Sequence, residues 1–142
     1  MTTARDVMHS GAECIEEGET LAAAAQKMRD LHVGALPICG NDNRLHGIIT
    51  DRDIVVRCIA EGQDPRTMTA GEMAQGPPIW VDADAEADEV LSVMIESSIR
   101  RVPVMEDHQL VGMISEADLA TQLDQGKVKQ FASAIYSAPP NS

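Results

Sequence analysis

The chain has 142 residues, a formal net charge of −12 at pH 7 and only 2% aromatic residues. This length suits one compact domain or two very small ones and excludes a large multidomain architecture. The negative charge repels phosphate backbones and anionic lipids, so we expect neither nucleic acid nor a membrane as a partner. The start MTTARDVMHS lacks a basic segment followed by an apolar run, and no apolar stretch approaches the roughly 18 residues of a membrane span. We expect a soluble, cytoplasmic protein.

The first half of the chain predicts a strand, a helix, two further strands and a second helix. A short apolar strand at 14–16 precedes the helix, for which Thr20 is a suitable N-cap. The apolar face of that helix carries five side chains: Leu21, Ala24, Ala25, Met28 and Leu31. Strands at 34–39 and 45–50 are joined by a polar turn, and the second helix follows over 51–60.

The second half predicts the same order of elements. A short strand at 79–81 is followed by a helix with Asp84 as its expected N-cap. Four side chains form the apolar face of this helix: Val90, Leu91, Met94 and Ile95. Two strands at 101–105 and 110–115 and a helix over 116–122 complete the half.

The two halves are copies of each other. ARDVM at 4–8 matches AGEM at 70–73, and LPI at 36–38 matches VPV at 102–104. GIITDRDI, starting at Gly47, matches GMISEADL, starting at Gly112, with an offset of 112 − 47 = 65 residues. Single-residue changes in the offset fall in polar loops, which tolerate changes of length. The sequence therefore divides into a first repeat, a connector, a second repeat and a tail: residues 3–61, 62–68, 69–123 and 124–142.

The repeats predict an α+β (mixed α/β) fold. The predicted order of elements in each copy is β-α-β-β-α. The small sheet of each copy then has an apolar face that one copy alone can barely cover. Packing of the two pseudo-symmetric copies as one compact module covers these faces and leaves a groove between the copies. We therefore expect that neither half folds alone.

A recurrent motif lies where the last strand of each repeat meets its last helix. It reads Gly, two apolar residues, Thr or Ser, two variable residues and Asp, over 47–53 and 112–118. Free N–H groups, a hydroxyl and the helix dipole can hold a phosphate at such a junction, and the carboxylate can accept both hydroxyls of a ribose. The same pattern is also a capping box that satisfies the first N–H groups of the helix. Capping and nucleotide binding can coexist.

These features resemble the CBS (cystathionine β-synthase) domain family. The resemblance rests on the tandem repeat, on the proline-containing strand segments 36–38 and 102–104 and on the two junction motifs, and it covers about residues 3–123. The length and the stretches MTTARD, GALPICG and DRDIV further resemble small hypoxic-response CBS-pair proteins of bacteria, often discussed as dormancy proteins. The resemblance implies a non-catalytic regulatory module whose clefts receive adenosine ligands such as AMP, ATP or S-adenosylmethionine.

The resemblance also implies roles for individual residues of the two motifs. Asp53 and Asp118 would meet the ribose of the ligand, and Thr50 and Ser115 would meet its phosphate. The remaining implied ligand-binding positions are the two motif glycines, Gly47 and Gly112.

An arginine makes the two repeats unequal. Arg101, two residues before Pro103, matches a position where some nucleotide-binding members of the family place a phosphate-contacting arginine, whereas the first repeat has Ala35 there. Whether Arg101 serves the motif of its own repeat or that of the other stays open. The acidic surface disfavours a polyphosphate unless a metal ion or the arginines at 52, 100 and 101 offset it, so AMP is the favoured ligand.

No catalytic or metal-binding motif is visible. The four histidines are isolated and lack HxH or HExxH spacing: His9, His32, His46 and His108. Asp42 and His46 could converge from one loop, but we predict no metal site and no required cofactor. Because GxSxG, P-loop and GxGxxG patterns are also missing, we expect no enzyme. Four methionines are expected to fill the core: Met8, Met28, Met94 and Met113.

Three cysteines are too few and too scattered for a secreted disulfide framework, so reduced thiols are the first expectation. Cys14 and Cys39 fall on two predicted strands of the same repeat. If those strands are neighbours, the two thiols can form a bridge in air-exposed protein, with Cys58 left as a buried thiol on the helix.

Apolar helix faces predict a homodimer. The candidate interface residues are Val55, Val56, Ile59, Leu119 and Leu123. The main alternative to a ligand sensor is a structural or interaction dimer with vestigial clefts and no nucleotide, for which metal binding is a further option. The tail 124–142 either docks on a dimer partner or frays.

Overall fold

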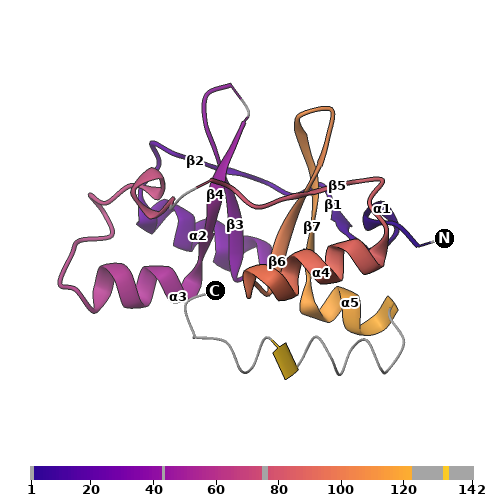
Figure 1. The fold of residues 1–142 in the computed structure, drawn as a ribbon. Helices are drawn as coiled ribbons and strands as arrows, with labels where there is room; N and C mark the ends of the chain where they lie inside the picture. Colours follow the sequence, from indigo (N-terminus) through magenta and orange to yellow (C-terminus); the bar gives the residue numbers. More distant parts are fainter. Residues whose placement is uncertain (1, 43, 75–76, 123–132, 135–142) are drawn as a thin grey trace. The chain divides into compact units, whose positions relative to one another are not determined.

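The computed structural model describes residues 2–42, 44–74, 77–122 and 133–134 (Figure 1). The chain forms two compact units, which are described separately below. One unit comprises residues 12–78, and the other combines the first 11 residues with the chain from Ile79 onward. Strands and helices alternate in both units, which confirms the mixed α/β fold class.

The unit formed by residues 12–78 contains a three-stranded sheet and one long helix. The sheet has the order β2-β3-β4, with β2 parallel and β4 antiparallel to β3. The strands and the helix have the following bounds: β2 Ile15–Glu16, α2 Leu21–Leu31, β3 Ala35–Cys39 and β4 Leu45–Thr50. Thr20 caps α2 as expected, because its hydroxyl accepts the N–H of Ala23 at 3.1 Å. The helix ends at His32, which takes the left-handed conformation common after a helix.

The helix that follows β4 in this unit differs from a regular α-helix. It begins as α3, Asp51–Asp53, and continues as the π-helix η1, Ile54–Ile59. The Ala60 N–H donates to the Val55 carbonyl at 2.8 Å, and the wider turn buries Ile54 and Cys58. Apolar periodicity predicts a helix here but does not distinguish π from α turns.

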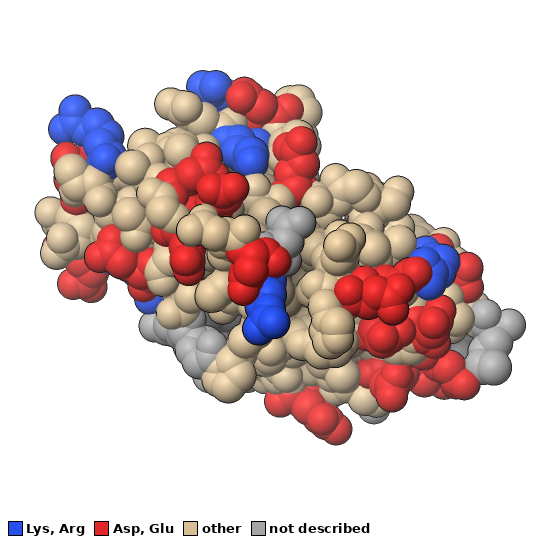
Figure 2. Space-filling view, turned by 90° about the horizontal axis from the view of Figure 1, so that it is seen from above, with Lys and Arg blue, Asp and Glu red and all other residues tan. Residues whose placement is uncertain are grey.

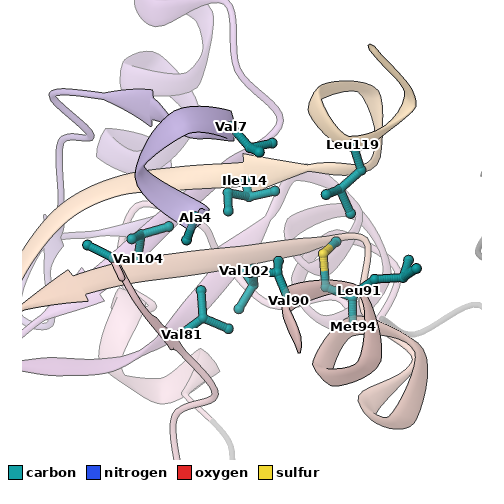
Figure 3. Packing of buried hydrophobic residues seen from close by; sticks show 11 residues of the cluster. Ala4, Val7, Val81, Val90, Leu91, Met94, Val102, Val104, Ile114 and Leu119 are labelled. Carbon is teal, nitrogen blue, oxygen red and sulfur yellow. The ribbon is translucent and has the colours of Figure 1, made fainter. Parts of the chain in front are cut away.

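The other unit contains a four-stranded sheet of order β1-β7-β6-β5. The strands are β1 His9–Ser10, β5 Val81–Asp82, β6 Arg101–Glu106 and β7 Gln109–Ser115, and the helices are α1 Ala4–Val7, α4 Ala87–Ser97 and α5 Glu116–Gln122. Figure 3 shows Ala4 and Val7 of α1 packed in the same core as Ile114 of β7 and Leu119 of α5. The N-terminal segment is thus part of the hydrophobic core of this unit.

The beginnings of the two repeats are exchanged between the units. The helix α1, from the first repeat, lies in the unit of the second, where the N–H of Ala4 donates to the carbonyl of Ala85 at 2.8 Å. The 3-10 helix η2, Ala70–Met73, begins the second repeat but lies in the unit 12–78. There the N–H of Ala70 donates to the carbonyl of Glu19, also at 2.8 Å. The repeats in the sequence and the compact units in space therefore do not coincide.

Several expectations about single residues are wrong. Ala25 and Leu31, expected on the apolar face of α2, are both exposed. Helix α4 begins at Ala87 with Glu86 at the N-cap position, so Asp84 is not the cap. Asp84 instead contacts the guanidinium of Arg5 at 3.1 Å, because the exchanged segment brings α1 next to the loop before α4. Leu119 is not an exposed interface residue, since it is 1% exposed and belongs to the core. Leu123 and the tail 124–142, apart from residues 133–134, lie outside the described residues.

The cysteines and methionines occupy defined places. Cys14, directly before β2, forms a disulfide with Cys39 at the end of β3, with 5.8 Å between the Cα atoms. Cys58 is a buried free thiol. Met28 and Met94 are core residues as expected, whereas Met8 and Met113 are half-buried.

Candidate functional site

The first junction motif follows strand β4. Thr50 pairs with Ala35 in the antiparallel register, so the motif lies beside the start of β3. The hydroxyl of Thr50 accepts the N–H of Asp53 at 3.1 Å, and Oδ2 of Asp53 accepts the N–H of Thr50 at 2.9 Å. This is a complete capping box, and it uses one carboxylate oxygen. Among the described residues, Oδ1 of Asp53 has no hydrogen-bond or ion-pair partner.

The second junction motif repeats this geometry after β7. The N–H of Ser115 donates to Oδ2 of Asp118 at 2.7 Å, and the hydroxyl of Ser115 lies 3.0 Å from the same oxygen. Asp118 is only 9% exposed. Arg101 pairs with Ser115 in the β6–β7 register, so its backbone lies beside the motif of its own repeat. The ligand roles expected for Arg101 and for the Thr/Ser and Asp residues remain predictions.

The second motif has an additional neighbour that the sequence patterns did not single out. The imidazole Nε2 of His9 lies 2.5 Å from Oδ1 of Asp118, the carboxylate oxygen that the cap does not use. His9 reaches this position because β1 pairs antiparallel with β7, opposite Met113. By the repeat offset, His9 corresponds to Ala74, because 74 − 9 = 65 residues. An isolated histidine shows no spacing motif, and its contact arises only from the segment exchange.

The motif glycines are explained by close packing. A Cβ atom at Gly112 would lie 2.7 Å from the backbone oxygen of His9, and one at Gly47 would lie 3.3 Å from Cβ of Ala74. Both glycines therefore let a segment from the other repeat approach the last strand. Their expected role in ligand binding stays a prediction.

Among the charged side chains visible in Figure 2, Asp and Glu cover more of the face than Lys and Arg. Arg5 forms ion pairs with two carboxylates, and its pKa is raised by its hydrogen bonds to Glu106 and then to Asp84. These ion pairs hold α1 against the rest of its unit, so the role of Arg5 is structural.

The loop between β3 and β4 brings Asp42 and His46 near each other. A side chain at Gly40 would collide with the His46 imidazole and would lie 3.2 Å from Oδ1 of Asp42. The Nδ1 atom of His46 is also 3.6 Å from Oε2 of Glu17. Within the described part of the chain, however, no group of three or more His, Cys, Asp or Glu side chains is arranged to hold a metal ion.

Comparison with known proteins identifies the class of protein that these repeats define. The sequence matches the CBS domain family twice, over residues 4–59 and 70–124. The chain belongs to the CBS domain family and carries two copies of the domain. CBS pairs are generally regulatory, non-catalytic modules.

Particular relatives are also similar over nearly the whole chain. Hypoxic response protein 1 of Mycobacterium tuberculosis is 55% identical over 137 residues, which cover 96% of each chain. A crystal structure of Hypoxic Response Protein I with two coordinated zinc ions superimposes with a TM-score of 0.80 at 56% identity, covering 87% of this chain and 100% of that one. A hexameric CBS-CP12 protein from bloom-forming cyanobacteria has a TM-score of 0.78 at 27% identity, over 87% of this chain and 72% of that one. These similarities confirm the resemblance to hypoxic-response CBS-pair proteins.

No helix within the described ranges combines the length and the apolar character that crossing a bilayer requires.

Proposed function

We propose that this chain is a non-catalytic, cytoplasmic sensor that binds an adenosine-type ligand, with AMP as the favoured ligand, and acts in a hypoxia or dormancy response. The observation that carries the proposal is the arrangement of the two junction motifs. In each one, the helix cap uses a single oxygen of the aspartate, Asp53 or Asp118. A carboxylate that caps through one oxygen can offer the other to a ribose hydroxyl, as Asp53 does with Oδ1, which is unpaired among the described residues, so capping and ligand binding are compatible.

The physiological setting comes from the relatives. Membership in the CBS family supports the regulatory role, and the similarity to Hypoxic response protein 1 supports the link to hypoxia. The acidic surface supports a ligand with few phosphates, because like charges repel at short range.

Zinc is the other ligand that the comparisons raise. A solved relative coordinates two zinc ions, but the described residues of this chain do not fit a zinc site of three or more ligands. His46 and Glu17 offer two donor side chains, fewer than the three or four protein ligands typical of zinc. We therefore assign no chemistry to zinc here.

Self-association is the second part of the proposal. Val55, Val56 and Ile59 are 58%, 42% and 53% exposed on the π-helix η1, and together they form an apolar face. We propose that this face packs on its counterpart in a second copy as a homodimer. The hexameric relative shows that related chains also form larger assemblies.

A thermal-shift screen tests the ligand proposal. Wild-type protein is heated with AMP, ADP, ATP, S-adenosylmethionine or zinc, each in a separate titration. A ligand present at 100 times its dissociation constant stabilises the folded state by ~2.7 kcal/mol, so AMP should raise the unfolding midpoint most among the nucleotides. If no adenosine compound shifts the midpoint, the motifs are helix caps and the alternative of an interaction dimer takes precedence.

The role of Arg101 requires a double-mutant cycle. Asp53→Ala and Asp118→Ala are each titrated with AMP, alone and combined with Arg101→Ala. Non-additive losses identify the motif that shares its ligand with the arginine. Because Arg101 lies opposite Ser115, we expect coupling with Asp118. Normal affinity in all single variants would exclude both motifs as nucleotide sites.

A further inference from the structure

The two junction motifs differ in the state of their aspartates. At Asp53 the oxygen not used by the cap has no partner among the described residues. At Asp118 the corresponding oxygen, Oδ1, lies 2.5 Å from the imidazole of His9. A ribose hydroxyl that approaches Asp118 therefore competes with a protein side chain, whereas one that approaches Asp53 does not.

The backbone of His9 is held by strand pairing, whereas most of its side chain faces solvent. Strand β1 pairs with β7 through His9 and Ser10, and the preceding helix α1 is anchored by the buried residues Ala4 and Val7. The side chain of His9 is nevertheless 80% exposed, while that of Asp118 is 9% exposed. Rotation of the imidazole into solvent would uncover Asp118 without moving a core residue.

The matching position of the other motif carries no such group. Ala74 occupies the position equivalent to His9, and its Cβ lies 3.3 Å from the Cβ position of Gly47 at the first motif. A methyl side chain cannot donate to a carboxylate. The chain thus has a histidine beside one aspartate and an alanine beside the other, at equivalent places of the repeat.

We propose that His9 is a latch that keeps the Asp118 motif closed to nucleosides until the imidazole is displaced. The inference rests on the proposed function, because it assumes that the motif aspartates accept a ribose. The latch predicts that, in the wild-type chain, AMP binds first at the Asp53 motif and with lower affinity at the Asp118 motif.

The test compares AMP binding by calorimetry in wild-type, His9→Ala and His9→Gln proteins. Wild type should bind one AMP per chain tightly and a second more weakly, and Asp53→Asn should weaken the tighter site at least tenfold. His9→Ala copies the alanine of the other repeat and should gain about tenfold in affinity at the second motif, equivalent to ~1.4 kcal/mol, so that both AMP molecules bind tightly. The amide of His9→Gln can still donate to Asp118, so this variant should behave as wild type. Adding Asp118→Asn to His9→Ala should remove the second site.

The outcomes separate the latch from the proposed function. Without ligand, His9→Ala should also melt earlier, because Oδ1 of a nearly buried carboxylate loses its partner. Earlier melting without a gain in AMP affinity would show a purely structural contact and overturn the latch, while AMP binding at Asp53 would leave the proposed function standing. AMP binding only in His9→Ala would support the latch and refute the role of Asp53. No binding in any variant would overturn both.

Discussion

Leu31 and Leu119 are both helical leucines, but their surroundings differ. Leu31 at the end of α2 is 40% exposed, whereas Leu119 in α5 is 1% exposed and packs with Val7 and Ile114. We predict that Leu119→Ala lowers the free energy of unfolding by about 2–5 kcal/mol, through lost burial and a residual cavity. Leu31→Ala is the matched control and should cost about 0.5 kcal/mol. Chemical denaturation measures both, and equal losses would contradict the placement of Leu119.

The disulfide is a second residue whose effect can be measured. Cys14 and Cys39 are 25 residues apart in the sequence. A disulfide that closes a loop of that length stabilises the folded state by roughly 3 kcal/mol. The double variant Cys14→Ser/Cys39→Ser should therefore unfold at lower denaturant than oxidised wild type and should match wild type under reducing conditions. Mass spectrometry that found three free thiols in air-oxidised protein would contradict the bridge.

The sequence predicted the junction residues because each motif is local, with hydroxyl and carboxylate three positions apart. Thr50 with Asp53 and Ser115 with Asp118 form the reciprocal bonds that this spacing favours. The contact of His9 depends on a strand pairing over more than one hundred residues, which no local pattern encodes.

At the level of elements, the hairpins were the most predictable part of the fold. Strands β3–β4 and β6–β7 match the expected alternation of apolar runs and polar turns. The two-residue strand β1 and the short helices α1 and η2 were not predicted, because β1 pairs with a strand of the other repeat and the two helices bury their few apolar side chains there. Tertiary contacts decide the conformation of such short segments.

The exchange of α1 and η2 predicts how fragments behave. Residues 1–62 include α1 without its unit and lack η2, whose Ala70 and Met73 are buried in the unit 12–78. We expect this fragment to show no cooperative thermal transition by circular dichroism. A fragment of residues 12–78 is the matched control and should retain more helical signal. Cooperative melting of residues 1–62 would show that the exchange is dispensable.

For the whole molecule, the apolar face on η1 predicts the oligomeric state. Sedimentation velocity of the wild-type chain at micromolar concentration should show a dimer, and Val56→Asp should shift it to monomer by burying a charge in the interface. Leu31→Asp places the same charge on exposed α2 and should leave the dimer intact. A strictly monomeric wild type would contradict the proposed interface, as would a Val56→Asp variant that still dimerises.

The central claim is that a junction motif of this CBS pair binds an adenosine nucleotide, and calorimetric titration with AMP tests it most directly. Asp53→Asn is the decisive variant, because its amide oxygen can still accept the N–H of Thr50 while the charged ribose acceptor is lost. The account predicts saturable AMP binding by wild type, and at least a tenfold loss, or about 1.4 kcal/mol, in a variant whose unfolding midpoint is nearly unchanged. Wild-type protein that releases or absorbs no heat of binding with AMP, or an Asp53→Asn variant with unaltered affinity, would contradict it.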